Sequence, residues 1–293
     1  MPNRQACHSG KPVALRSWET DMHRHHALWF ALCLVIAVAP GGEFLPDAEA
    51  TASLSAGTAI NKAGRQRMLS QRLAKAWIML GMNIAPERAQ AILTDSFSQF
   101  ENQLAELRGF APSQGAREAL ARLEKEWTNY KSVLATKPSR ENATTLYDAN
   151  EAVQKAAHRL TLAYEASAKS PSYRLINIAG RQRMLSQRMA KFWLFEAWGI
   201  NSRAAQMEFG LARAEFASGL HQLSISPYTT VEIRAALEQL DREWSVYQAA
   251  LTARRGIPDR IRMAAEIADM SERVLELCEK IVVLYEQQAS DAR

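Results

Sequence analysis

Two eighteen-residue segments of this chain carry nearly the same pattern of cationic and small residues. Residues 60–77 read INKAGRQRMLSQRLAKAW and residues 176–193 read INIAGRQRMLSQRMAKFW, with differences at only three positions. Each segment holds several Lys and Arg residues and no Asp or Glu. Because cations without acidic partners favour negatively charged groups, the chemistry that these residues indicate is the binding of an anion.

The pattern within each segment fits a small planar oxyanion. Gly64, Arg67 and Gln71 are three or four residues apart and therefore lie on one side of a helix. A glycine inside a helix costs about 1 kcal/mol relative to alanine, so its presence in both segments indicates close approach by a ligand or another backbone. A guanidinium one turn away can donate two parallel N–H bonds to an oxyanion. The second segment repeats the arrangement with Gly180, Arg183 and Gln187.

Arg67 and Arg183 would face each other if the two helices packed side by side about a pseudo-twofold axis. Two unit charges about 6 Å apart repel by roughly 3 kcal/mol at an effective dielectric constant of 20. An anion between them would replace this repulsion with two attractions, so ligand binding would tighten the interface. The alternative is that the segments serve only to pack helices, with Arg67 paired to a glutamate of another helix.

A second group of cations, Arg65, Arg72 and Lys75, falls on another side of the same helix, near Asn61. We interpret this group as a solvated basic face. The residues typical of metal sites and of histidine-dependent catalysis are scarce, because only two histidines, His158 and His221, follow residue 50. The sequence therefore predicts no metal site, no catalytic residues and no cofactor, and we do not expect an enzyme.

The elements that must position these residues are helices. Apolar residues recur at three- and four-residue spacing, and prolines fall where helices should begin or end. We expect helices over 54–83, 86–109, 114–136, 139–168, 173–199, 201–224, 228–254 and 257–288, with Ser139, Ser202 and Asp259 as N-caps.

The repeat extends well beyond the two segments. Residues 117–134 match 234–251, including Trp127 with Trp244, and Tyr164 near the end of the first copy corresponds to Tyr285. Short connections between amphipathic helices favour antiparallel neighbours. The expected fold class is therefore all-α, with two tandem antiparallel four-helix bundles over residues 51–170 and 171–293.

Residues 1–50 have the organisation of a secretory signal peptide. A basic stretch, HRHH, precedes an apolar run over residues 27–40, and Ala48-Glu49-Ala50 forms a cleavage site, with Met22 as a plausible start. Cleavage would release the protein into the periplasm; the alternative is an uncleaved anchor at residues 27–40. Only Cys278 would remain, so no internal disulfide can form. Export and a net charge of only +5 argue against a nucleic-acid partner.

The motif AGRQRMLSQR resembles the signature helix of the NarX-like, or PilJ-type, sensor domain of nitrate/nitrite sensors and type IV pili chemotaxis transducers. The resemblance covers about residues 52–170 and 172–289 and implies a four-helix bundle. In the nitrate sensors of that family the ligand lies between two such helices, on residues that correspond to Arg67 and Gly64, and to Arg183 and Gly180. The GRQRMLSQR sequence is more similar to the motif of the chemotaxis transducers than to that of the nitrate sensors. Nitrate is therefore a candidate ligand that the resemblance alone does not establish.

The resemblance implies a non-enzymatic sensor or accessory protein that binds a small oxyanion, with nitrate or nitrite favoured. Because the chain ends at Arg293 without a kinase or methyl-accepting segment, we expect a separate signalling or membrane protein as its partner. The motif helices could pair within one chain as a pseudo-dimer or between chains as a homodimer. The alternative function is a helical interaction module that docks on a membrane receptor without a small ligand.

Overall fold

The computed structural model divides into two units, Met1–Glu49 and Ala50–Arg293, and describes residues 54–168, 170–200, 202–253 and 257–291. All of these residues belong to the second unit. The signal peptide and anchor predicted within residues 1–50 therefore lie outside the described residues. Of the helices that are described, none combines the length and the apolar character that a bilayer span requires.

Every regular element in the described ranges is an α-helix, which confirms the all-α fold class expected for tandem bundles. The first repeat contains α2 (Ala56–Gly81), α3 (Pro86–Arg108), α4 (Gln114–Leu134) and α5 (Ala143–Ala168). The second repeat contains α6 (Pro171–Ala197), α7 (Arg203–Ser224), α8 (Val231–Thr252) and α9 (Ile257–Asp291).

Prolines and capping residues mark several of the helix ends. Pro86 opens α3, and Ser202 caps α7 by accepting a hydrogen bond from the Ala205 amide, as predicted. Helix α5 begins at Ala143, later than predicted, because residues 140–142 form a turn. Asp259 was predicted as an N-cap but lies inside the first turn of α9, where a carboxylate still complements the helix dipole.

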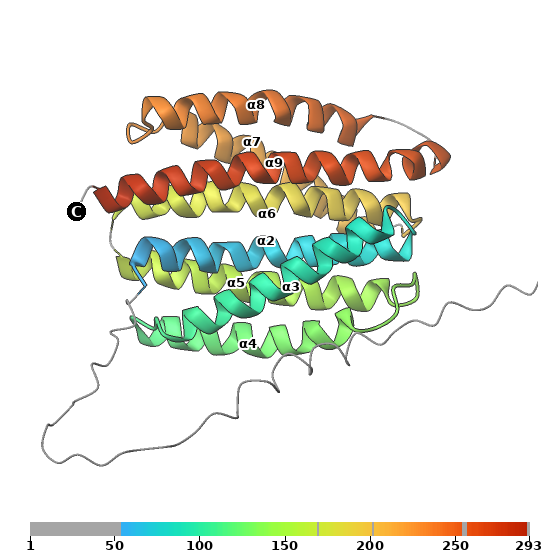
Figure 1. Cartoon of the computed structure of the whole chain (residues 1–293), viewed down its shortest axis with the longest axis horizontal. Coiled ribbons are helices and arrows are strands. Elements are labelled where there is room, and N and C mark those ends of the chain that lie inside the picture. Colours follow the sequence, from blue (N-terminus) through green and yellow to red (C-terminus); the bar gives the residue numbers. More distant parts are fainter. Residues whose placement is uncertain (1–53, 169, 201, 254–256, 292–293) are drawn as a thin grey trace, which may run out of the picture. The chain divides into compact units, whose positions relative to one another are not determined.

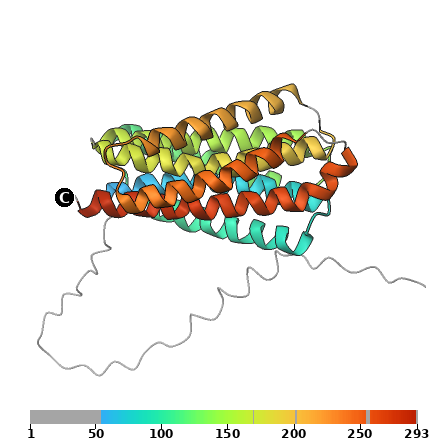
Figure 2. The ribbon, with the colours of Figure 1, turned by 90° about the horizontal axis from the view of Figure 1, so that it is seen from above.

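Helices α2 and α6, which carry the repeated segments, lie next to each other and run in the same direction (Figure 1). Helix α2 packs against α3 and α5 of its own repeat and against α9 of the other. Helix α6 packs correspondingly against α7 and α9, and against α5 of the first repeat. The helices follow roughly one axis when seen from above (Figure 2). Because neighbours surround them, α2 and α6 are buried on nearly all sides, unlike α3, α4, α7 and α8, which each bury one stripe.

The aromatic core repeats between the two copies. Trp127 of α4 stacks on Phe100 of α3 with ring centroids 3.7 Å apart, and Trp244 of α8 lies against Phe216 of α7 at 4.3 Å. Both tryptophans are buried, as is Cys278, whose burial raises the pKa of its thiol. These matched contacts join α3 to α4 in the first repeat and α7 to α8 in the second.

Candidate functional site

The paired glycines and arginines meet where α2 lies against α6. A methyl group placed on Gly64 would lie 3.1 Å from Nη2 of Arg67 and 3.6 Å from Nη2 of Arg183. The same group on Gly180 would lie 3.2 Å from Nη2 of Arg183 and 3.6 Å from Nη2 of Arg67. The missing side chains therefore leave room for both guanidinium groups, and the juxtaposition of Arg67 and Arg183 predicted from the repeat is present.

Arg67 is fully buried and has only neutral hydrogen-bond partners. Its Nε donates to the Gly64 carbonyl at 3.4 Å, Nη2 donates to the Asn177 carbonyl at 3.4 Å, and Nη1 lies 3.2 Å from Nδ1 of His158. Across the described ranges, no carboxylate lies within ion-pair distance of this guanidinium. Burial, followed by the charges of Arg181 and Arg183, lowers the pKa of Arg67 from 12.5 to about 9, against a raising effect of Glu165.

His158 is neutral at physiological pH. Burial, followed by the charges of Arg67 and Arg181, lowers the pKa of its imidazole from 6.5 to about 4. Because a guanidinium can only donate, Nδ1 of His158 must accept the bond from Arg67 and the ring proton must sit on Nε2. His158 therefore contributes no charge of either sign to the site at neutral pH.

Arg183 has a different environment from Arg67. It is also fully buried, but its Nη1 forms an ion pair with Oε2 of Glu279 on α9 at 2.8 Å. Its Nη2 donates to the Asn61 carbonyl at 3.2 Å, which repeats the bond from Arg67 to Asn177. We call Gly64 with Arg67, and Gly180 with Arg183, the two half-sites. They share their backbone contacts and differ in charge, because Arg183 has an acidic partner and Arg67 has none in the described part of the chain.

Gln71 and Gln187 are buried one turn beyond the arginines. Nε2 of Gln187 donates to the Ser271 carbonyl at 2.9 Å, and Nε2 of Gln71 lies 3.5 Å from the hydroxyl of Ser70. Within the described ranges the amide oxygens of both glutamines lack a hydrogen-bond partner, and neither glutamine is hydrogen-bonded to Arg67 or Arg183. The structure thus brings four of the six predicted site residues together and places the two glutamines beside them.

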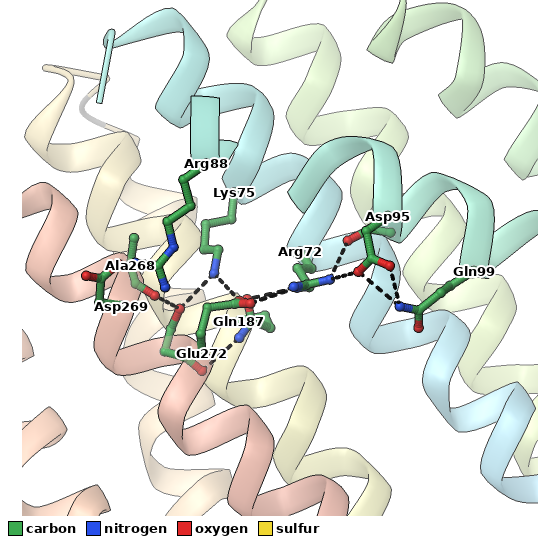
Figure 3. A network of polar contacts seen from close by, with 11 residues as sticks. Arg72, Lys75, Arg88, Asp95, Gln99, Gln187, Ala268, Asp269 and Glu272 are labelled. Atoms are coloured by element: carbon green, nitrogen blue, oxygen red, sulfur yellow. Dashed lines mark hydrogen bonds and ion pairs between the residues drawn. The ribbon is translucent and has the colours of Figure 1, made fainter. Parts of the chain in front are cut away.

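The prediction of a solvated basic face on α2 is wrong. Lys75 is fully buried, and its Nζ contacts Oε1 of Glu272 at 2.6 Å and the Ser271 hydroxyl at 2.8 Å. Arg72 lies between Glu272 of α9, at 2.7 Å, and Asp95 of α3, also at 2.7 Å (Figure 3). Arg65 is likewise paired with Glu279 of α9. These cations contact the other repeat because the side of α2 that faces away from its own bundle packs against α6 and α9.

A matching ionic network lies on α6. Arg188 binds both carboxylate oxygens of Glu151 on α5, at 2.8 Å each, and also contacts Glu208 of α7 at 2.7 Å. Lys191 is fully buried and contacts Glu151 at 2.9 Å and Oδ1 of Asn150 at 2.7 Å. Each repeat therefore supplies, from its last helix, the acid that neutralises the other repeat's motif helix. The sequence contained one sign of this pairing, because the two glutamates, Glu151 and Glu272, occupy corresponding positions of the two repeats.

Comparison with known proteins agrees with this architecture. The family described as type IV pili methyl-accepting chemotaxis transducer N-terminal domain, PilJ, matches the chain twice, over residues 50–153 and 164–267. No curated protein and no solved structure shows a significant match. The two matches together cover more than half of the chain and include both copies of the Gly-x-x-Arg segment. The chain belongs to the PilJ family of transducer sensor domains and carries that domain twice.

Proposed function

We propose that this protein is a non-enzymatic sensor or accessory protein that binds a small oxyanion, with nitrate or nitrite favoured, between α2 and α6. The observation that carries the proposal is the fully buried Arg67, which has no acidic partner in the described residues and lies beside Arg183 at two glycines. Leaving a buried charge unpaired costs several kcal/mol, so a site of this kind favours an anion strongly. The PilJ family supplies the broader role, sensing in signal transduction.

Binding at this site must be coupled to movement of the helices. The side chains of Arg67 and Arg183 have no exposed surface, so a ligand can reach them only when α2 and α6 separate or their side chains rearrange. A ligand that binds one arrangement better than the other shifts the population toward it. The change would then pass to a separate signalling or membrane protein, and a periplasmic location would suit a sensor domain of this family.

Thermal unfolding with added anions tests the proposal. The purified protein is heated with nitrate, nitrite, sulfate or chloride at matched ionic strength. A ligand at 100 times its Kd stabilises by about 2.7 kcal/mol, which for a chain of this size raises Tm by roughly 5–10 °C. We expect this shift with nitrate or nitrite, its loss in Arg67→Gln, and its retention in Arg122→Gln, a control arginine on the surface.

The second candidate function is a helical module that docks on a membrane receptor without a small ligand. Two exposed apolar side chains of α7, Met207 and Leu211, favour it, because they are about half or more exposed and one turn apart. If every anion left Tm unchanged while Arg67→Gln still unfolded cooperatively, the arginine pair would be a packing device. The function would then depend on a protein partner.

A further inference from the structure

His158 and Glu279 occupy corresponding positions in the two repeats. The offset that relates Tyr164 to Tyr285 near the ends of α5 and α9 also relates Glu151 to Glu272 and places Glu279 opposite His158. The contacts agree with this register, because His158 touches Nη1 of Arg67 and Glu279 touches Nη1 of Arg183. The residue of the last helix that contacts the buried arginine therefore differs between the repeats. It is the neutral His158 on α5 for Arg67 and the negatively charged Glu279 on α9 for Arg183.

The surroundings of the two guanidinium groups are otherwise closely matched. Each donates Nη2 to an asparagine carbonyl of the other motif helix, and each asparagine amide contacts a glutamate, Glu286 for Asn61 and Glu165 for Asn177. The preceding arginines are both paired as well. Arg65 shares Glu279, and Arg181 contacts Glu215 at 2.7 Å. The difference in charge at the centre therefore comes from the residues on α5 and α9.

The difference sets how much negative charge the site can accept. Two buried guanidinium groups carry two positive charges, and Glu279 supplies one negative charge to Arg183. The partly exposed Arg65 shares that carboxylate, whereas Arg67 has no carboxylate within ion-pair distance in the described residues, so the positive charge of Arg67 is uncompensated. A dianion would introduce a second negative charge beside Glu279, and two like charges a few ångströms apart in a partly desolvated site repel by several kcal/mol.

We propose that Glu279 acts as a built-in counter-ion, so that the site takes a single monovalent anion and holds it on the Arg67 side. This inference rests on the proposed function and specifies which charge class the site selects. The ligand takes the place of His158 as the acceptor for Nη1 of Arg67. Because His158 is neutral, it does not repel the anion that replaces it as a hydrogen-bond acceptor. His158 and Glu279 are therefore the specificity-determining pair.

Exchanging these two residues between the half-sites gives a matched test. His158→Glu supplies Arg67 with the carboxylate that Arg183 already has, and Glu279→His removes it from Arg183. Isothermal titration calorimetry on the full chain, with nitrate and with sulfate, measures both affinities, and circular dichroism confirms that each variant is folded. Glu279→Gln is a second variant that removes the charge with a smaller change of shape.

We expect His158→Glu to weaken nitrate binding by at least about 100-fold, the effect of a unit charge a few ångströms away. We expect Glu279→His and Glu279→Gln to change the preference between sulfate and nitrate in favour of sulfate by at least about tenfold. If the wild-type protein binds nitrate but His158→Glu binds it equally well, or neither Glu279 variant changes the preference, the assignment of these residues is overturned and the anion site stands. If the wild-type protein binds none of the anions, the proposed function fails instead.

Discussion

At the scale of single residues, the two glycines of the motif lie against the guanidinium groups of Arg67 and Arg183. Gly64 and Gly180 lie within 3.1–3.6 Å of guanidinium nitrogens, measured from where a methyl group would stand. Those nitrogens are the ends of flexible side chains and can move by a few tenths of an ångström. A methyl group here would therefore be accommodated by the protein, and it would take up space that the proposed anion would need between the arginines.

We accordingly expect Gly64→Ala to fold with unchanged or greater stability and to lose anion binding. Alanine is favoured over glycine inside a helix by up to about 1 kcal/mol, which offsets the tighter contact. Gly81→Ala is the contrasting variant, because its methyl group would lie 2.2 Å from the Trp198 ring and should destabilise by about 1–3 kcal/mol. Urea denaturation and nitrate titration of both variants separate the two effects. A Gly64→Ala protein that bound nitrate normally would contradict this role for the glycine.

At the scale of elements, helix positions were far more predictable than charge partners. Of the eight helices predicted after residue 50, seven begin in the described part of the chain within three residues of their predicted starts, because prolines, caps and apolar spacing are local signals. The partners of Arg72 and Lys75 were not local, since Glu272 lies on α9 of the other repeat. A helix that packs on both sides has no solvated face, and neither periodicity nor charge within the segment reveals that second interface.

The same distant pairing makes α5 and α9 sensitive to the loss of one carboxylate. Glu272→Gln leaves Lys75 buried without an acidic partner, and Glu151→Gln does the same to Lys191. We expect each change to lower the free energy of unfolding by about 3–5 kcal/mol. Glu124→Gln, which removes a surface pair with Arg108, is the control and should cost less than about 1 kcal/mol. Equal costs in urea denaturation for all three variants would refute the central importance of the two networks.

At the scale of the whole molecule, stability should fall in acid over two distinct ranges. The lysine and arginine partners hold the pKa of Glu151 and Glu272 at about 2, below the ordinary 4.5, so their contribution is complete above pH 4.5 and is lost as pH falls toward 2. His158, with its pKa lowered from 6.5 to about 4, binds its proton more readily in the unfolded chain, so stability also declines from pH 6.5 to 4. The free energy of unfolding of Glu151→Gln/Glu272→Gln, measured against pH, should decline less than that of the wild type in the lower range, to which Asp95, Glu101 and Glu279 still contribute. That of His158→Gln should decline less between pH 6.5 and 4.

The exchange of acids between repeats also predicts how one repeat would behave without the other. A chain that ends after α5 would leave Lys75 of α2 without its acidic partner and Arg72 with Asp95 alone, and would present its own Glu151 on α5. Because Glu151 occupies the position of Glu272, a twofold pair of such chains could rebuild both ionic networks. We therefore expect the isolated first repeat to form a homodimer, with two copies of Arg67 facing each other and each beside a neutral His158.

Sedimentation of the isolated repeat measures this, and Glu151→Gln is the variant that should reduce the dimer. A homodimer of this kind has no counterpart of Glu279, so two uncompensated guanidinium groups would lie at its centre. Its assembly should depend on added anion, and sulfate should promote it more strongly than nitrate, the reverse of the order expected for the full chain. A monomeric repeat at every anion concentration would mean that the linkage between the two copies, rather than their ionic networks, holds α2 against α6.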